Sequence, residues 1–140
     1  MAEAVGLSSG LLTLIIFAYN TSKSLYEAVS SFKSKRRTIQ DILADLDSHV
    51  NLLEKIREQA QNSEEIEKFE PLREPLNCCA ITCREMLEML DACTTHSQDG
   101  RASVRDWLNM RYHEKCFEDM KKRLASFKST LSIAFESINM

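Results

Sequence analysis

With 140 residues and a net charge of −3, the chain has the size of one domain and lacks the basic excess of a general nucleic-acid-binding protein. Three glycines and two prolines are too few for the turns of an all-β protein, so long helices are expected. The five cysteines include the adjacent pair Cys78 and Cys79. An odd number with this spacing is a poor disulfide framework and favours reduced thiols in a cytoplasmic protein.

The first predicted helix, from about Ala2 to Phe32, contains the most apolar stretch of the chain. Its seam residues recur three, four or seven positions apart; they are Leu7, Leu11, Leu14, Ala18, Leu25, Val29 and Phe32. A second apolar surface lies off this seam and consists of Leu12, Ile16, Phe17 and Tyr19. Because a helix without a polar face is normally buried on all sides or placed against lipid, this helix is the candidate functional element.

Neither a secretory signal nor a membrane span explains this apolar run. The residues before it include Glu3 but no Lys or Arg, and Tyr19-Asn20 interrupts any small-residue cleavage site. From Val5 to Tyr19, a helix rising about 1.5 Å per residue is clearly shorter than the roughly 30 Å hydrocarbon core of a bilayer. A run of this length suits a bundle, the membrane interface or an assembly of several copies.

A basic link follows the first helix. Four of its five residues are positively charged, namely Lys33, Lys35, Arg36 and Arg37. One interpretation is a solvated connector whose cations suit a helix C-terminus. The other is a contact with anionic lipid, worth about 1 kcal/mol per cation. The link lies next to the apolar run, and both interpretations stay open.

Three amphipathic helices follow. The second, from about Thr38 to Gln61, has a buried seam predicted at Ile39, Ile42, Leu46, Val50, Leu53, Ile56 and Ala60, with His49 beside Val50. A polar connector over residues 62–70 leads to a third helix from about Leu72 to Thr95, whose seam is predicted at Leu72, Leu76, Cys79, Cys83, Met86, Leu90 and Cys93. The fourth and longest helix runs from about Val104 to Ile138. Its basic outer face complements the acidic second and third helices.

These elements predict an all-α chain, one domain over residues 1–140. The expected architecture is a four-helix bundle with a hydrophobic N-terminal helix and a long C-terminal helix.

The sequence predicts neither a catalytic nor a metal site. Four residues could nominally ligate zinc, namely Cys79, Cys83, Cys93 and His96. Their spacing matches none of the usual zinc pairs, and two of the cysteines already belong to a helix seam. The three histidines fall on separate segments, and His49 is expected to be a packed core residue. Since no nucleophile or phosphate-loop motif occurs, we expect no enzyme and no cofactor.

Three segments together resemble a known family. They are the opening MAEAVGLSSGLLTL, the stretch from Ser24 to Val29, and the helix from Ile39 to Leu53. They are similar to the fungal N-terminal domain of STAND proteins, the HeLo-like group of helical bundles found ahead of nucleotide-binding modules in NLR-like receptors. Residues matching the apolar N-terminal helix of that family are Leu7, Leu11, Leu14 and Ile15.

The resemblance implies a non-catalytic signalling or effector domain of the cell-death and heterokaryon-incompatibility type. In such domains, receptor oligomerisation releases the N-terminal helix, which inserts into or disrupts a membrane. The expected partners are further copies of the chain, membrane lipids and the rest of a receptor. The expected location is the cytoplasm, with recruitment to the plasma membrane on activation.

Two functional hypotheses follow. In the first, the bundle is membrane-active once its first helix is released. The candidate contact residues are Leu11, Leu12, Leu14, Ile15, Ile16, Phe17 and Tyr19, with the basic link at anionic lipids. In the alternative, the chain is a soluble dimerisation or adaptor module that binds a protein partner through Leu12, Ile16 and Tyr19.

Overall fold

Four α-helices and one 3-10 helix make up the part of the chain that the computed structural model describes, which is residues 2–31, 37–94 and 114–139. Side chains are described for residues 10–31, 37–91 and 117–139. The elements are α1 (Ala2–Ser30), α2 (Arg37–Asn62), the 3-10 helix η1 (Ile66–Leu72), α3 (Arg73–Thr94) and α5 (Glu114–Ile138).

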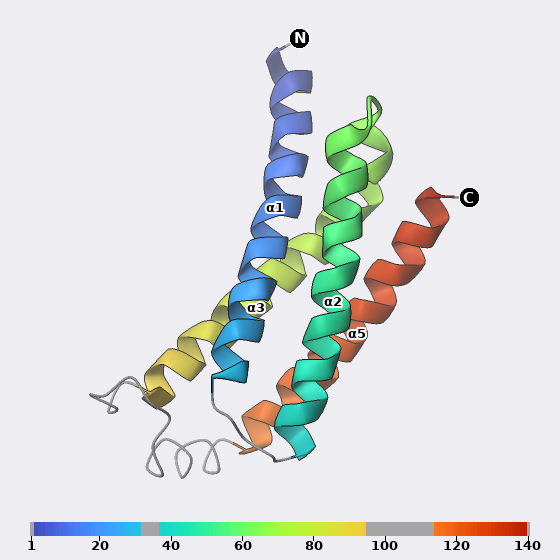
Figure 1. The fold of residues 1–140 in the computed structure, drawn as a ribbon. Helices are drawn as coiled ribbons and strands as arrows, with labels where there is room; N and C mark the ends of the chain where they lie inside the picture. Colours follow the sequence, from blue (N-terminus) through green and yellow to red (C-terminus); the bar gives the residue numbers. More distant parts are fainter. Residues whose placement is uncertain (1, 32–36, 95–113, 140) are drawn as a thin grey trace.

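The four α-helices form a bundle in which α1 and α3 run in one direction and α2 and α5 in the opposite one, and the N- and C-terminal ends of the described chain lie toward the same end (Figure 1). α1 packs between α2 and α3, whereas α5 packs mainly against α2 and less extensively against α3. In the described residues, α1 is therefore diagonal to α5, and α2 is diagonal to α3. This arrangement confirms the predicted all-α four-helix bundle.

The helix boundaries agree with the prediction except in the connector over residues 62–70. The second half of that stretch is η1, whose Phe69 is fully buried. η1 contacts all four α-helices and so closes one end of the bundle. A single buried aromatic residue among polar neighbours creates no periodic pattern, so the prediction of a plain connector was wrong here. The predicted start of the last helix, near residue 104, lies outside the described residues.

The described core consists of two apolar clusters stacked along the bundle axis. The first, near the α1–α2 link, includes Leu25, Val29, Ile42, Leu46 and Leu124. The second, near η1, includes Leu11, Ile15, Leu53, Phe69 and Leu131. Between the two clusters lie two fully buried polar residues, Ser22 of α1 and His49 of α2. The core is thus divided by a polar layer.

Two predicted seams each differ from the structure at one position. On α1, Ile15 is fully buried where the prediction placed Leu14, which is half-buried. On α2, His49 is fully buried where the prediction placed Val50, also half-buried. Both registers keep the three- and four-residue spacing, so periodicity alone does not separate them. The burial of His49 confirms that it is a packed core residue.

Charge complementarity between α5 and its neighbours is confirmed. Lys121 Nζ donates to Asp41 Oδ2 of α2 at 2.9 Å, and this hydrogen bond lowers the pKa of Asp41. Arg123 of α5 lies 3.9 Å from a carboxylate oxygen of Glu85 on α3. Because these pairs are exposed, they help to select which helices are neighbours more than they stabilise the fold.

Gly10 lies in the interior of α1 and is exposed. A Cβ atom built at this position meets no heavy atom within 4 Å, so close packing does not require glycine here. Gly10→Ala is therefore expected to raise the free energy of unfolding by about 0.5–1 kcal/mol, because alanine has the higher helix propensity. Urea denaturation of the two proteins measures the change. A loss of stability would contradict the open environment of Gly10.

Candidate functional site

The seven predicted contact residues of α1 lie in three environments. Leu11, Ile15 and Tyr19 are buried in the bundle, and Leu12, Leu14 and Ile16 are half-buried. Phe17 is 45% exposed. The apolar run therefore faces mainly inward, against α2 and α3, and one large apolar side chain of the seven is on the surface. Within the described residues, no helix is both long and apolar enough to cross a bilayer.

The outward face of α1 is otherwise small or polar. Its exposed residues include Gly10, Thr13, Phe17, Asn20, Ser24 and Glu27. Large exposed apolar side chains also occur on other helices, with Ile81 of α3 at 49% and Ile133 of α5 at 63%. In the folded bundle, the apolar character of α1 is thus largely covered.

Tyr19 joins α1 to α2. The residue is 8% exposed, and its ring lies under the guanidinium of Arg57, whose central carbon is 4.6 Å from the ring centroid. Such a cation–π contact adds to the burial of the ring. Because Tyr19 is covered within its own bundle, its placement counts against a partner interface that needs this side chain on the surface.

Of the four cations in the basic link, the described residues include Arg37. Arg37 begins α2 and is exposed, as a lipid or solvent contact requires. The other three predicted cations, Lys33, Lys35 and Arg36, lie outside the described residues.

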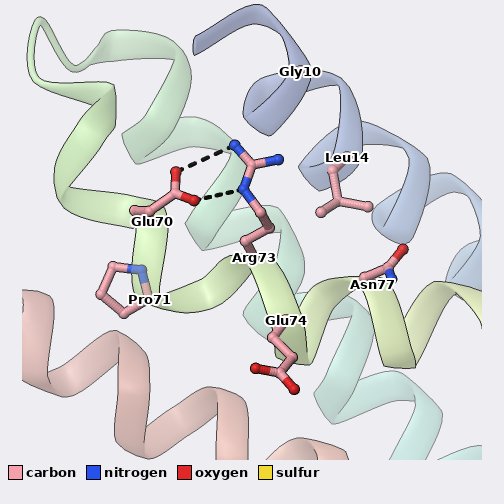
Figure 2. A pocket seen from close by; sticks show the side chains of 7 residues that line it. All are labelled: Gly10, Leu14, Glu70, Pro71, Arg73, Glu74 and Asn77. Atoms are coloured by element: carbon pink, nitrogen blue, oxygen red, sulfur yellow. Dashed lines mark hydrogen bonds and ion pairs between the residues drawn. The ribbon is translucent and has the colours of Figure 1, made fainter. Parts of the chain in front are cut away.

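An open groove of about 750 Å³ runs between α1 and the junction of η1 with α3 (Figure 2). It is lined by Gly10, Leu14, Glu70, Pro71, Arg73, Glu74 and Asn77. Arg73 Nε donates to Glu70 Oε1 at 2.6 Å across one side of the groove, which lowers the pKa of Glu70. These lining residues include no nucleophile with an adjacent base. The groove does leave Leu14 partly uncovered by α3.

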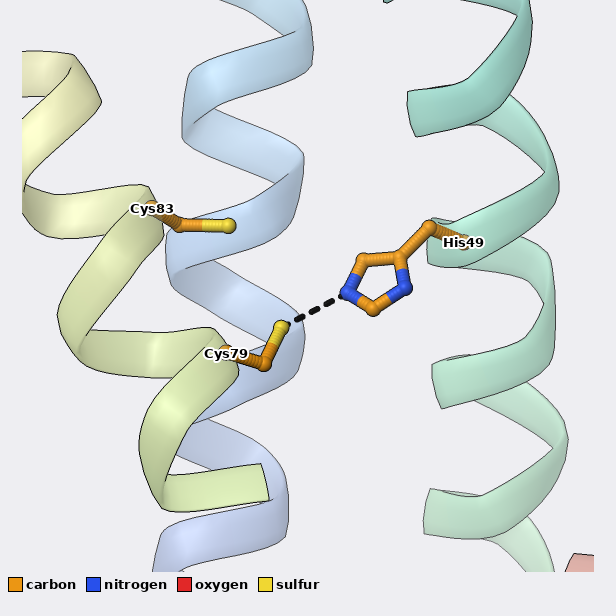
Figure 3. Close-up of side chains that lie close together, drawn as sticks. All are labelled: His49, Cys79 and Cys83. Atoms are coloured by element: carbon orange, nitrogen blue, oxygen red, sulfur yellow. Dashed lines mark hydrogen bonds between the residues drawn. The ribbon is translucent and has the colours of Figure 1, made fainter. Parts of the chain in front are cut away.

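The polar core layer comprises Ser22, His49, Cys79 and Cys83. It joins three helices at mid-core, and Figure 3 shows His49 of α2 facing the two cysteines of α3. His49 Nε2 and Cys79 Sγ are hydrogen-bonded at 2.7 Å, a contact that crosses the diagonal of the bundle. The hydroxyl oxygen of Ser22 lies 3.9 Å from Cys79 Sγ and 3.7 Å from Cys83 Sγ. All four side chains are fully buried.

Burial controls the protonation of this layer. It lowers the pKa of His49 to about 4, so the imidazole is neutral at physiological pH. The hydrogen bond between the two thiols, together with burial, raises the pKa of Cys79 well above its ordinary value. The same hydrogen bond lowers the pKa of Cys83. His49 Nδ1 is buried and has no hydrogen-bond partner. Because sulfur is a weak hydrogen-bond donor and acceptor, the hydrogen bonds within the layer offset only part of the free energy that its polar groups lose when they leave water.

The layer brings together residues that sequence reasoning kept apart. The donor atoms of His49, Cys79 and Cys83 all lie within 4.8 Å of one another, which makes a possible metal-binding group. Spacing had grouped the two cysteines with Cys93 and His96, whose side chains lie outside the described residues. The sequence could have indicated this group only if the seam of α2 had been placed at His49 in place of Val50.

Comparison with protein-family models gives a match over nearly the whole chain. A family model described as the N-terminal domain of the pigment biosynthesis cluster protein PigL matches residues 2–140. No significant match occurs among curated proteins or among solved structures.

Proposed function

Because the chain belongs to the PigL N-terminal family, a helical domain family related to fungal HeLo-like N-terminal domains, we propose that it is a non-catalytic signalling and effector domain. In this proposal, copies of the domain self-associate, and α1 is released toward a membrane. The domain is cytoplasmic at rest, and its partners are further copies, lipids and the remainder of a receptor chain.

The observation that carries the proposal is the way α1 is held. Leu11, Ile15 and Ala18 are fully or almost fully buried, and no ion pair joins the described side chains of α1 to another helix. Apolar contact, supplemented by Tyr19 and Ser22, retains this helix. Release would expose large apolar side chains at about 1.5–3 kcal/mol each in water, and lipid would recover that free energy.

Clustering supplies the second requirement. The apolar run of a single released helix is too short to span the bilayer, so one copy would lie in the membrane interface. Several copies held together bind the same surface with greater avidity. The basic link adds attraction to anionic head groups.

A vesicle-leakage assay with two matched variants tests the proposal. Phe17→Glu and Ile133→Glu each place a carboxylate at an exposed apolar position, so both are expected to leave the fold intact. Dye leakage from anionic vesicles, with the domain clustered through a fused oligomeric tag, is expected to fall at least about tenfold in Phe17→Glu, because charge on an inserting helix is costly. It is expected to stay at the wild-type level in Ile133→Glu.

Deleting residues 1–19 is unsuitable as a control, because it removes Leu11, Ile15 and Tyr19 from the core. If the clustered wild-type domain causes no dye leakage from anionic vesicles, the membrane proposal is refuted. Equal leakage by the two variants would show that α1 is not the inserting element.

The soluble dimerisation or adaptor module remains the second candidate, favoured by the partial exposure of Leu12 and Ile16. Multi-angle light scattering separates it from the first. A stable dimer that Ile16→Glu dissociates, together with intact vesicles, would select this alternative.

A further inference from the structure

The proposed function assigns no role to Cys79, Cys83 and His49 of the polar core layer. Its four side chains cost stability in an apolar core, yet three of them are ligand types that metal ions prefer. These three come from two helices, His49 from α2 and both cysteines from α3, and converge at mid-core, where the two apolar clusters meet.

We propose that Cys79, Cys83 and His49 bind a zinc ion in the core of the bundle, with Ser22 or a water molecule at the fourth position. Two thiolates and one imidazole nitrogen are a common zinc donor set, and a tetrahedral site accepts one oxygen ligand. Cores of helical bundles hold metals between facing helices.

The geometry fits with a small adjustment. Zinc bonds of about 2.3 Å to sulfur and about 2.0 Å to nitrogen place the donor atoms of a tetrahedral site roughly 3.5–3.8 Å apart. The two Ser22–sulfur distances of 3.7 and 3.9 Å are close to this spacing. His49 Nε2 and Cys79 Sγ are now 2.7 Å apart. To bind a metal between them, these two atoms must move apart by roughly 1 Å, to a distance of about 3.5 Å.

The sequence provides this arrangement through two spacings. Cys79 and Cys83 are four residues apart, so both sulfurs lie on one face of α3. His49 occupies the seam of α2 and reaches that face from the diagonal position. Its Nε2 points at the sulfurs, while Nδ1 points away from them (Figure 3), so Nε2 is the ligating atom.

Charge balance also favours zinc. Binding of Zn²⁺ displaces one proton from each thiol, and the two thiolates neutralise the ion, so the loaded site has no net charge. A neutral site avoids the large cost of burying an isolated charge in an apolar core. The exposed neighbour Cys78 lies outside the group of three and serves as a control.

Refolding the reduced full chain with Zn²⁺ tests the proposal, because a fully buried site loads most readily as the protein folds. We expect about one zinc per chain after removal of free metal, and a higher melting temperature than in the chelator-treated protein. Co²⁺ in place of Zn²⁺ is expected to give the visible bands of a tetrahedral site and a near-ultraviolet thiolate-to-metal charge-transfer band.

Three variants identify the ligands. Cys78→Ser is expected to bind zinc like the wild type, whereas the double variant Cys79→Ser/Cys83→Ser and the single variant His49→Leu are expected to bind roughly 100-fold more weakly or worse. His49→Leu makes the core less polar and so is expected to fold without metal, which separates loss of a ligand from failure to fold. Competition with a chromophoric chelator measures each affinity.

Several results would overturn the proposal. Wild-type affinity in the cysteine double variant would place the metal on other cysteines. Wild-type affinity in a folded His49→Leu variant would remove His49 from the site. Binding of copper(I) without zinc would overturn the choice of metal, and absence of binding by any metal would leave the layer as a plain hydrogen-bonded group.

Discussion

Lowering the pH from 7 to 4 in the presence of a chelator is expected to destabilise the wild-type chain by about 3 kcal/mol more than the His49→Leu variant. The folded protein holds the pKa of His49 at about 4, because burial penalises the imidazolium. In the unfolded chain the imidazole titrates near its ordinary pKa of 6.5. The unfolded state therefore binds more protons in this pH range.

The sign follows from that difference. Above pH 6.5 both states carry a neutral imidazole, and His49 contributes no pH dependence. As the pH falls from about 6.5 to about 4, the unfolded state gains a proton that the folded state does not, so stability falls. Below about pH 4 both states are protonated, and this contribution becomes constant.

Urea denaturation at several pH values measures the effect, with the difference between the two proteins isolating His49. The carboxylates and the other two histidines are common to both, so their contributions cancel. Parallel stability curves for wild type and His49→Leu would contradict the burial of His49. The chelator removes any bound metal, which keeps this measurement independent of the zinc proposal.

Phe69→Ala is expected to lower the free energy of unfolding by about 3–5 kcal/mol. Phe69 is fully buried in the core cluster beside Leu11, Ile15 and Leu131, and it belongs to η1, which contacts every α-helix in the described chain. Truncation removes the packing of a large ring and leaves a cavity at the closed end of the bundle. The loss is therefore at the upper end of the range for core substitutions.

Ile133→Ala is the matched control, because Ile133 is 63% exposed on α5. Its stability is expected to change by less than about 0.5 kcal/mol. Both variants are compared with the wild type by urea denaturation. If the m-value, the slope of the free energy of unfolding against urea concentration, is unchanged, the substitution has altered stability alone. A loss below about 1 kcal/mol for Phe69→Ala would show that η1 is a loosely attached connector.

Much of the fold could be predicted from the sequence, because three- and four-residue spacing carries most of the information in amphipathic helices. The third helix shows this well, since Leu76, Cys79, Cys83, Met86 and Leu90 are all buried as the spacing predicts. η1 could not be predicted in the same way, because a 3-10 helix of seven residues has too few positions for a repeat.

The polar core layer was missed for a different reason. Val50 and His49 fit the α2 spacing equally well, and the usual preference for an apolar core residue favours valine. The structure selects His49, which lies opposite Cys79 across the bundle. Because α2 and α3 do not follow each other directly around the bundle, only the three-dimensional packing shows that these residues meet.

The two diagonal helices differ in what attaches them. α5 is linked to α2 by Lys121 with Asp41 and to α3 by Arg123 with Glu85, whereas the described side chains of α1 form no such pair. Dissolved electrolyte screens exposed charges over about 8 Å at physiological concentration and about 3 Å at 1 M, but it does not weaken apolar burial. Rising ionic strength is therefore expected to weaken the two ion pairs of α5 while leaving the apolar contacts that bury Leu11, Ile15 and Ala18 of α1 intact.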